Sequence, residues 1–94
     1  LTEDEIPTIT PYHEDRWAEL GDNKVPIDAS LKLIDGLHAR WTALLGSMTD
    51  SDFDKKFNHP ETGEWTLEAV LALYAWHSRH HTAHISHLRQ RSGW

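Results

Sequence analysis

One helical pattern, running over about residues 66–91, constrains this sequence more than any other feature. Because an α-helix advances about 100° per residue, the spacing of residues predicts which side chains share a face. The apolar side chains of this segment fall on one stripe, which should pack inward. The stripe consists of Leu67, Val70, Leu71, Tyr74, Ile85 and Leu88. His81 lies at its centre, and His77 lies one turn earlier and about 40° to the side.

Five of the chain's eight histidines lie in this predicted helix. Two imidazoles four residues apart stand one above the other on a helix, and neutral imidazole is a common ligand of zinc and nickel. The spacing therefore makes His77 and His81 a candidate metal pair. His84 lies on the same flank, His80 lies further round the helix, and His87 faces away. The same spacing is compatible with hydrogen-bonded core histidines, so the pattern alone leaves both interpretations open.

Length and composition exclude several classes of protein. A chain of 94 residues forms one domain at most, and the absence of cysteine excludes disulfides and thiolate ligands. The formal net charge of −6 argues against nucleic-acid binding. No apolar run is long enough to span a membrane and no signal peptide opens the chain, so we expect a cytoplasmic protein without a membrane partner.

A second amphipathic helix is predicted over about residues 28–48, with Asp28 as its N-cap. Its apolar positions recur at three- and four-residue spacing and are Leu31, Ile34, Leu37, Trp41, Leu44, Leu45 and Met48. His38 falls beside Ile34 and Trp41, in the seam between helices. A core position is favoured for His38 over a ligand role, but it is retained as an alternative ligand.

The remaining segments are predicted to be short helices and loops. Residues 1–25 read as irregular chain with a short helix within residues 12–20. Residues 49–65 read as a short helix through Phe53 and Phe57, followed by a loop over residues 58–64. Thr66 and Gly93 are predicted as the N-terminal and C-terminal caps of the last helix. The expected fold class is all-α.

Two long amphipathic helices cannot cover each other on all sides, which makes a four-helix bundle the natural completion. The other two helices must come from a second copy or from a missing N-terminal half. The metal ligands are also too few. One helix supplies two histidines, whereas a catalytic metal site usually has three protein ligands and an open position.

Several stretches of the chain resemble the DinB-like family, and most closely its YfiT-type branch of metal-dependent hydrolases linked to bacillithiol transferases. These stretches are 38–45 (HARWTALL), 57–60 (FNHP), 65–70 (WTLEAV), 73–85 (LYAWHSRHHTAHI) and 93–94 (GW). The resemblance implies that residues 1–94 are the C-terminal half of an up-down-down-up four-helix bundle. It also implies a divalent metal, nickel or zinc, held by three histidines.

In this family two of the three ligands form an HxxxH motif on the last helix, which His77 and His81 match. His80 and His84 have the same spacing and rank second; if His77 and His81 bind the metal, His84 lies behind them or faces the substrate. The family's third histidine precedes the first residue of this chain, and no position here matches it. We therefore expect weak or partial metal binding by this chain alone, unless His38 or a partner chain supplies a ligand.

Two chemistries and one non-catalytic role follow as hypotheses. A three-histidine metal can activate water for hydrolysis, or a small-molecule thiol such as bacillithiol for transfer to an electrophile. No residue stands out as a general base. Glu64, Glu68 and Tyr74 are candidates only because they lie near the loop or the apolar stripe. The alternative is a helical self-association module, a homodimer whose histidines are core polar groups and which holds no stoichiometric metal.

Overall fold

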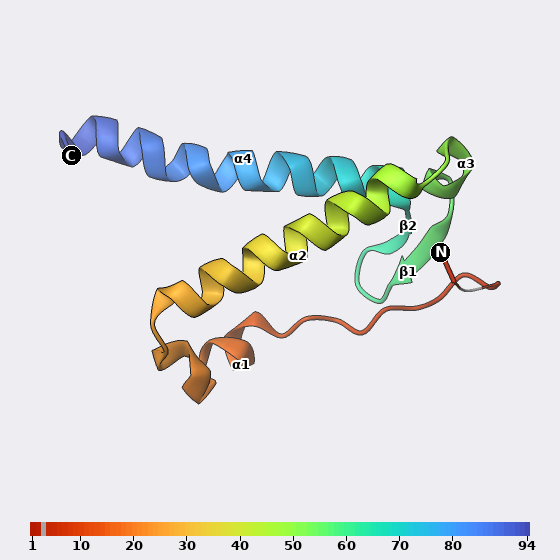
Figure 1. Cartoon of the computed structure of the whole chain (residues 1–94), viewed down its shortest axis with the longest axis horizontal. Helices are drawn as coiled ribbons and strands as arrows, with labels where there is room; N and C mark the ends of the chain where they lie inside the picture. Colours follow the sequence, from red (N-terminus) through yellow and green to blue (C-terminus); the bar gives the residue numbers. More distant parts are fainter. Residues whose placement is uncertain (3) are drawn as a thin grey trace.

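The computed structural model describes residues 1–2 and 4–94, and within them it is predominantly helical (Figure 1). The elements in chain order are α1 (Glu14–Ala18), the 3₁₀ helix η1 (Gly21–Lys24), α2 (Ile27–Ser47), α3 (Asp50–Phe53), β1 (Lys56–His59), β2 (Gly63–Thr66) and α4 (Leu67–Ser92). No helix in this described part of the chain is long and apolar enough to cross a membrane.

The long helix α4 begins and ends at the two caps predicted from the sequence. The Thr66 hydroxyl oxygen accepts a hydrogen bond from the Ala69 N–H at 3.1 Å, which satisfies one of the free donors of the first turn. Gly93 adopts a left-handed conformation with φ 68°, and its N–H donates to the Arg89 carbonyl. A residue with a side chain would be strained at that φ, which is why a glycine ends α4.

The second long helix, α2, begins one residue earlier than predicted. Pro26 is its N-cap, and no side-chain hydrogen bond caps it, so the prediction of Asp28 as N-cap is wrong. Asp28 instead lies in the first turn, where its negative charge interacts favourably with the helix dipole. Proline at the boundary starts the helix because it has no N–H to satisfy and cannot continue a helix from the preceding turn.

A β-hairpin replaces the predicted loop, so the all-α expectation is wrong for this segment. Strands β1 and β2 pair antiparallel, with Lys56 opposite Thr66 and His59 opposite Gly63. Phe57, which was predicted to lie in a short helix, is in β1 opposite Trp65. The Asn, Pro and Gly residues that predicted a loop also suit a hairpin turn, and local composition does not separate the two.

Side chains close the turn of this hairpin. The Nδ1 atom of His59 accepts hydrogen bonds from the N–H groups of Glu61 and Thr62, at 3.2 and 3.4 Å. The indole N–H of Trp65 donates to the Thr62 hydroxyl at 2.8 Å. Gly63 has φ 85°, the left-handed conformation that the tight turn requires. His59 is therefore the last residue of β1 rather than the loop residue that the sequence predicted, and its ring has a structural role in closing the turn.

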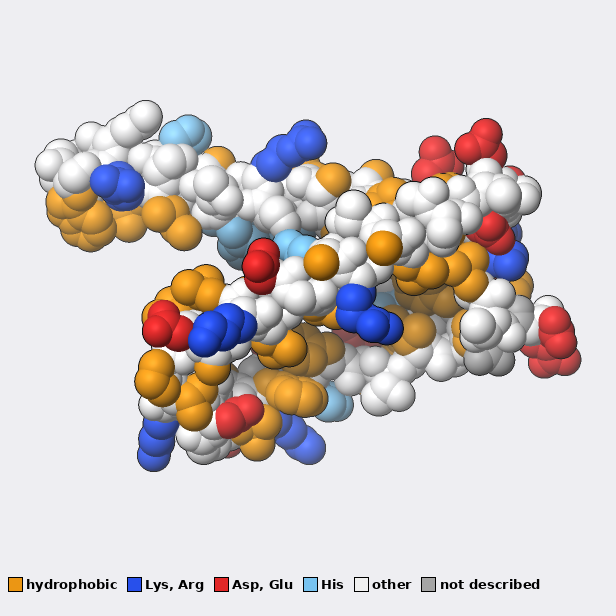
Figure 2. Space-filling view, in the orientation of Figure 1, with side chains coloured by type: hydrophobic (Ala, Val, Ile, Leu, Met, Phe, Trp, Pro, Cys, Tyr) orange, Lys and Arg blue, Asp and Glu red, His pale blue; other side chains and the backbone are white. Residues whose placement is uncertain are grey.

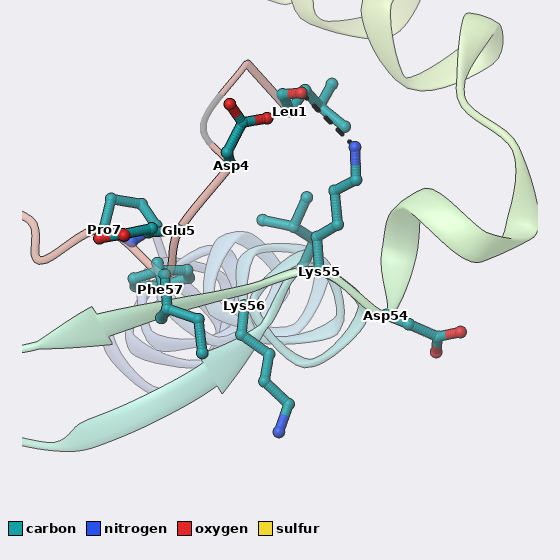
Figure 3. A pocket seen from close by; sticks show the side chains of 10 residues that line it. Leu1, Asp4, Glu5, Pro7, Asp54, Lys55, Lys56 and Phe57 are labelled. Atoms are coloured by element: carbon teal, nitrogen blue, oxygen red, sulfur yellow. Dashed lines mark hydrogen bonds between the residues drawn. The ribbon is translucent and has the colours of Figure 1, made fainter.

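The N-terminal segment lies alongside β1. The Asn58 N–H donates to the Pro7 carbonyl at 2.7 Å, and the Ile9 N–H donates to the Asn58 carbonyl at 3.0 Å. Lys55 extends toward the start of the chain and its ammonium donates to the Leu1 carbonyl at 3.5 Å (Figure 3). These contacts enclose a hollow of about 360 Å³ beside Phe57, far along the chain from the α4 histidines.

The two long helices run antiparallel, meet at the end near α3 and diverge toward the other end (Figure 1). Near the meeting point the rings of Trp41 and Tyr74 pack edge to face, with centroids 5.2 Å apart and an interplanar angle of 89°. Because the helices diverge, the predicted apolar stripes are covered only near the meeting point, where Leu45, Val70 and Leu71 are half-buried. Ile34 on α2 is 50% exposed and Ile85 on α4 is 64% exposed.

No residue in the described part of the chain is fully buried. The radius of gyration is 16.9 Å, whereas a compact domain of this length has about 12 Å. The accessible surface is 8480 Å², roughly 2,900 Å² more than a folded monomer of this mass exposes. Hydrophobic side chains gather on the underside of α4 toward its C-terminal end and in the region below α2, and histidines lie between them along α4 (Figure 2). This arrangement leaves the apolar faces of both long helices open to further packing.

The short helix α3 is held at its N-terminus by hydrogen bonds from Thr49 to Asp52. The backbone N–H and the hydroxyl of Thr49 both donate to the Asp52 carboxylate, at 2.9 and 2.8 Å, and the Lys55 ammonium lies 3.2 Å from it. These hydrogen bonds, with that of the Thr49 N–H the largest cause, lower the pKa of Asp52 from 3.8 to about 2.

We predict that Asp52→Asn flattens the acid dependence of stability. A carboxyl whose pKa is lowered on folding stabilises the protein above its unfolded pKa of 3.8 and stops doing so as the pH falls toward 2. The free energy of unfolding of the wild type should therefore fall more steeply between these pH values than that of Asp52→Asn. Urea unfolding followed by circular dichroism measures this difference. The control Asp54→Asn removes a neighbouring carboxylate and should keep the wild-type slope.

We predict that Thr66→Ala destabilises the chain by about 1 kcal/mol, because it removes the cap of α4. The control is Thr42→Ala within α2, which removes a hydroxyl away from any helix end. Urea unfolding at one fixed protein concentration compares the two variants. Equal stability of Thr66→Ala and Thr42→Ala would show that the hydrogen bond to Ala69 does not stabilise α4.

Candidate metal centre

The imidazoles of His77 and His81 converge on α4. Their Nε2 atoms lie 2.8 Å apart, and their ring centroids are separated by 4.5 Å with an interplanar angle of 58°. The helix itself produces this approach, because residues four apart stand one above the other on its surface. Both side chains are exposed in this chain, so nothing in it blocks access to the two nitrogens.

The chemistry of this pair fits a divalent metal. Metal–imidazole bonds are about 2.0–2.1 Å long, so two nitrogen ligands of a tetrahedral metal lie about 3.3 Å apart. The observed separation is the length of a hydrogen bond, which one Nε2–H donates to the other ring. A small rotation of both exposed rings and loss of that proton would present two lone pairs to one ion.

A second pair, His80 and His84, adjoins the first. Their ring centroids are 4.2 Å apart with an interplanar angle of 63°. Although the helical pattern placed His80 away from the apolar stripe, it is half-buried, whereas His77 and His81 are exposed. Desolvation is the largest cause that lowers the pKa of His80, and the neighbouring histidines add to it. A neutral imidazole is the form that binds metals, so this pair remains the alternative ligand set.

Trp76 has a role that the sequence analysis missed. Its indole stacks on the ring of His80, with centroids 4.5 Å apart and an interplanar angle of 19°. It is also nearly parallel to the ring of His77, at 6.4 Å. The four-residue spacing between Trp76 and His80 was the available signal, since it places the two rings on one face. The indole covers one side of the His80 ring, and the ring of His84 lies 4.2 Å from it as well.

A third ligand is not brought to these histidines within the described part of the chain, where no group of three His, Asp or Glu side chains is arranged to hold a metal. His38 is exposed on α2, with its ring 6.5 Å from that of Trp41. The seam position predicted for His38 is therefore wrong, because α2 diverges from α4. The ring of His84 lies 5.9 Å from that of His81 and is nearly perpendicular to it.

The candidate general bases are poorly placed for this centre. Glu64 forms an ion pair with Lys56 across the hairpin, with an N–O distance of 2.6 Å. Glu68 lies nine residues before His77, which is about 14 Å along the helix axis. Tyr74 lies within one turn of His77, but its ring packs on Trp41. Of the candidates from the sequence, only Tyr74 is near the histidines.

An apolar hollow of about 740 Å³ lies between α2 and α4, within one turn of His77 along α4. Its walls carry one charged side chain and two aromatic rings. The lining residues are Leu37, Arg40, Trp41, Ala43, Leu44 and Tyr74. An apolar hollow with a single charged group suits a small organic molecule better than a macromolecule.

Comparisons with known proteins agree on one family. The family model of the DinB superfamily matches residues 1–85. Relatives from Bacillus mycoides (strain KBAB4) and Bacillus cereus (strain B4264) are each 58% identical over 88 residues, which is 94% of this chain and 51% of each relative. Their names assign them provisionally as metal-dependent hydrolases.

The solved structure of YfiT from Bacillus subtilis is similar to 99% of this chain, with a TM-score of 0.85 and 52% identity, and the match covers 54% of that protein. YfiT is described as "a probable metal-dependent hydrolase with an unusual four-helix bundle topology". The chain thus spans about half the length of the relatives that it matches.

We predict that His77→Ala or His81→Ala weakens binding of Ni²⁺ or Zn²⁺ by more than the roughly 10- to 100-fold that loss of an outer hydrogen-bond partner typically costs. Isothermal titration calorimetry measures the affinity. His13→Ala and His87→Ala are matched controls and should bind as the wild type does. If affinity instead falls only in His80→Ala and His84→Ala, the second pair holds the metal.

Proposed function

This chain belongs to the DinB superfamily, and we propose that it contributes His77 and His81 to the metal centre of a divalent-metal-dependent hydrolase or thiol S-transferase. The observation that carries this proposal is the 2.8 Å approach of the two Nε2 atoms on α4. The provisional names of the relatives agree with the hydrolase class. Histidine ligands in a chain without cysteine favour nickel or zinc as the ion.

When bound, such an ion supplies Lewis acidity, which lowers the pKa of a water or thiol beside it. The residues of this chain hold and orient the reactants. His77 and His81 would hold the ion, and Trp76 stacks on the neighbouring ring of His80 and fixes it. We propose His84, whose ring lies 5.9 Å from that of His81, as the imidazole that accepts a proton from the reacting group.

The hollow between α2 and α4 is the proposed substrate site. Its apolar wall suits the carbon skeleton of a small molecule, and the Arg40 guanidinium at its edge suits an anionic group. We propose either an ester-like substrate that is hydrolysed or an electrophile that receives a thiol, with bacillithiol as the candidate thiol. Hydrolysis and thiol transfer would use the same metal and the same proton acceptor. The hollow could therefore hold the substrate of either reaction.

The bundle and the ligand set need a further element. We propose that residues 1–94 form one half of a four-helix bundle, because the chain spans about half of its relatives and leaves two helix faces uncovered. The additional helices and the third ligand then come from a segment outside these residues or from another chain. That arrangement would bury the histidines between helices and exclude bulk water from the ion.

A second candidate function is a non-catalytic helical module that self-associates through these faces. The uncovered apolar surface of α2 and α4 favours it. In that case the histidines are polar groups of an interface. The module then associates equally well with and without metal, whereas the enzyme loses activity when the metal is removed.

We predict metal-dependent turnover of a small-molecule substrate by the Ni²⁺- or Zn²⁺-loaded protein in which the further element completes the bundle formed by residues 1–94. Hydrolysis of p-nitrophenyl esters and transfer of bacillithiol to monobromobimane, each followed optically, measure the two chemistries. EDTA, His77→Ala and His81→Ala should each abolish the rate above background, and His87→Ala should not. A fully metal-loaded protein without either activity would contradict the enzyme assignment, as would a rate that EDTA leaves unchanged.

A further inference from the structure

We propose that the hairpin formed by β1 and β2 is a pH-sensitive turn, which neutral His59 holds closed and protonated His59 opens. The hairpin lies beside α3, at the end of the structure where the two long helices meet (Figure 1). The proposal uses neither the α4 histidines nor the uncovered helix faces, and it does not rest on the proposed function. It gives His59 a role that depends on its charge, in addition to its structural role in the turn.

Two backbone donors converge on one nitrogen of the His59 ring. The Nδ1 atom accepts hydrogen bonds from the N–H groups of Glu61 at 3.2 Å and of Thr62 at 3.4 Å. A backbone N–H can only donate, so Nδ1 must carry a lone pair and the ring proton must be on Nε2. Side-chain oxygens of Asn and Asp close turns in the same way. The closed turn therefore selects one tautomer of the neutral ring.

Protonation of His59 removes both hydrogen bonds. An imidazolium carries a hydrogen on each nitrogen and has no acceptor, so its Nδ1–H would point at the two backbone N–H groups of the turn. Glu61 and Thr62 are exposed, and in an open turn their N–H groups can bond to water instead. Closing of the turn and protonation of the ring therefore exclude each other. As a consequence, the open turn gains population as the pH falls through the range in which imidazole titrates.

The strands place no charge on the face that carries the His59 ring. Side chains alternate between two faces along a strand, and His59 shares its face with Phe57 and Trp65. All three of these residues are half-buried. The Lys56–Glu64 ion pair, with an N–O distance of 2.6 Å, lies on the other face. The hairpin itself therefore offers the protonated ring no carboxylate on its own side.

The segments around the hairpin do not compensate for the charge either. Residues 7–11, which lie along β1, have no ionisable side chain. Lys55, just before β1, extends toward the Leu1 carbonyl. The remaining carboxylates are those of Glu61 in the turn and Glu68 in the first turn of α4, which contacts β2. Among the described residues neither forms an ion pair with His59, so protonation gains no partner while the turn stays closed.

The turn is connected to the N-terminal segment through the residue next to His59. The Asn58 N–H donates to the Pro7 carbonyl at 2.7 Å, and the Asn58 carbonyl accepts from the Ile9 N–H at 3.0 Å. These two hydrogen bonds hold the N-terminal segment along β1 as a short parallel bridge. Opening of the turn frees the end of β1 immediately beside them. We therefore expect acid to loosen the N-terminal segment as well as the turn.

Nuclear magnetic resonance tests this switch in the protein in which the further element completes the bundle formed by residues 1–94. Long-range ¹H–¹⁵N spectra at about pH 7.5 report the tautomer of His59, and we expect the ring proton on Nε2. Amide exchange, corrected for its intrinsic pH dependence, reports opening. Between about pH 7.5 and about pH 5, protection of the Glu61 and Thr62 N–H groups should fall at least about fivefold, which corresponds to one lost hydrogen bond. Amides of α2 are the internal reference and should keep their protection.

His59→Asn separates the acceptor from the titration. Its Oδ1 atom offers an acceptor one bond from Cγ, as Nδ1 does, and it does not take up a proton in this pH range. Protection of the turn should therefore match that of the neutral wild type and stay constant with pH. His59→Ala offers no acceptor and should show the low protection of the acid form at both pH values. His13→Asn, at an exposed position, is the matched control and should keep the wild-type pH dependence.

Three results would overturn the proposal. A ring proton on Nδ1 of wild-type His59 at neutral pH would exclude the acceptor role, and this measurement needs no variant. Constant protection of the turn in the wild type would show that protonation does not open it. A pH dependence that persists in His59→Asn would assign the opening to another group.

Discussion

The rest of this structure depends on two amphipathic helices that diverge, so that in the described part of the chain their apolar faces are covered only near α3 and the hairpin. Where α2 and α4 meet, Trp41 and Tyr74 pack edge to face; elsewhere the stripes that should form a core face outward. Hydrophobic burial scales with the area removed from water, so this chain gains much less from it than a closed bundle would. The hairpin and the helix caps order the backbone, but they do not supply a core.

The position of the histidine pair does not depend on packing between helices, because both residues lie on one helix. His77 and His81 approach through the helical repeat alone, which is why the pair exists although α4 is largely uncovered. Coordination of an ion needs ligands from another direction, and only a second packed element can bring them. The core and the metal centre are therefore incomplete for the same reason, and any element that covers α4 affects both.

Predictions from the sequence were correct for features that depend only on residues within one helix or its caps. The Thr66 cap and the left-handed Gly93 both depend on neighbours within a few residues. The hairpin was missed because pairing of Phe57 with Trp65 is a contact between separate segments, and four-residue strands carry little pattern. The N-cap of α2 was misplaced because Pro26 and Asp28 are both suitable starting residues.

The sequence by itself determined the family, the two long helices and the i, i+4 spacing of His77 and His81, since periodicity and caps are local properties of the chain. Only the tertiary structure decided how far the two helix faces are covered. The divergence of α2 from α4 leaves His38 exposed, and it leaves Ile34 50% exposed and Ile85 64% exposed. These outcomes depend on the angle between the helices, which no residue spacing encodes.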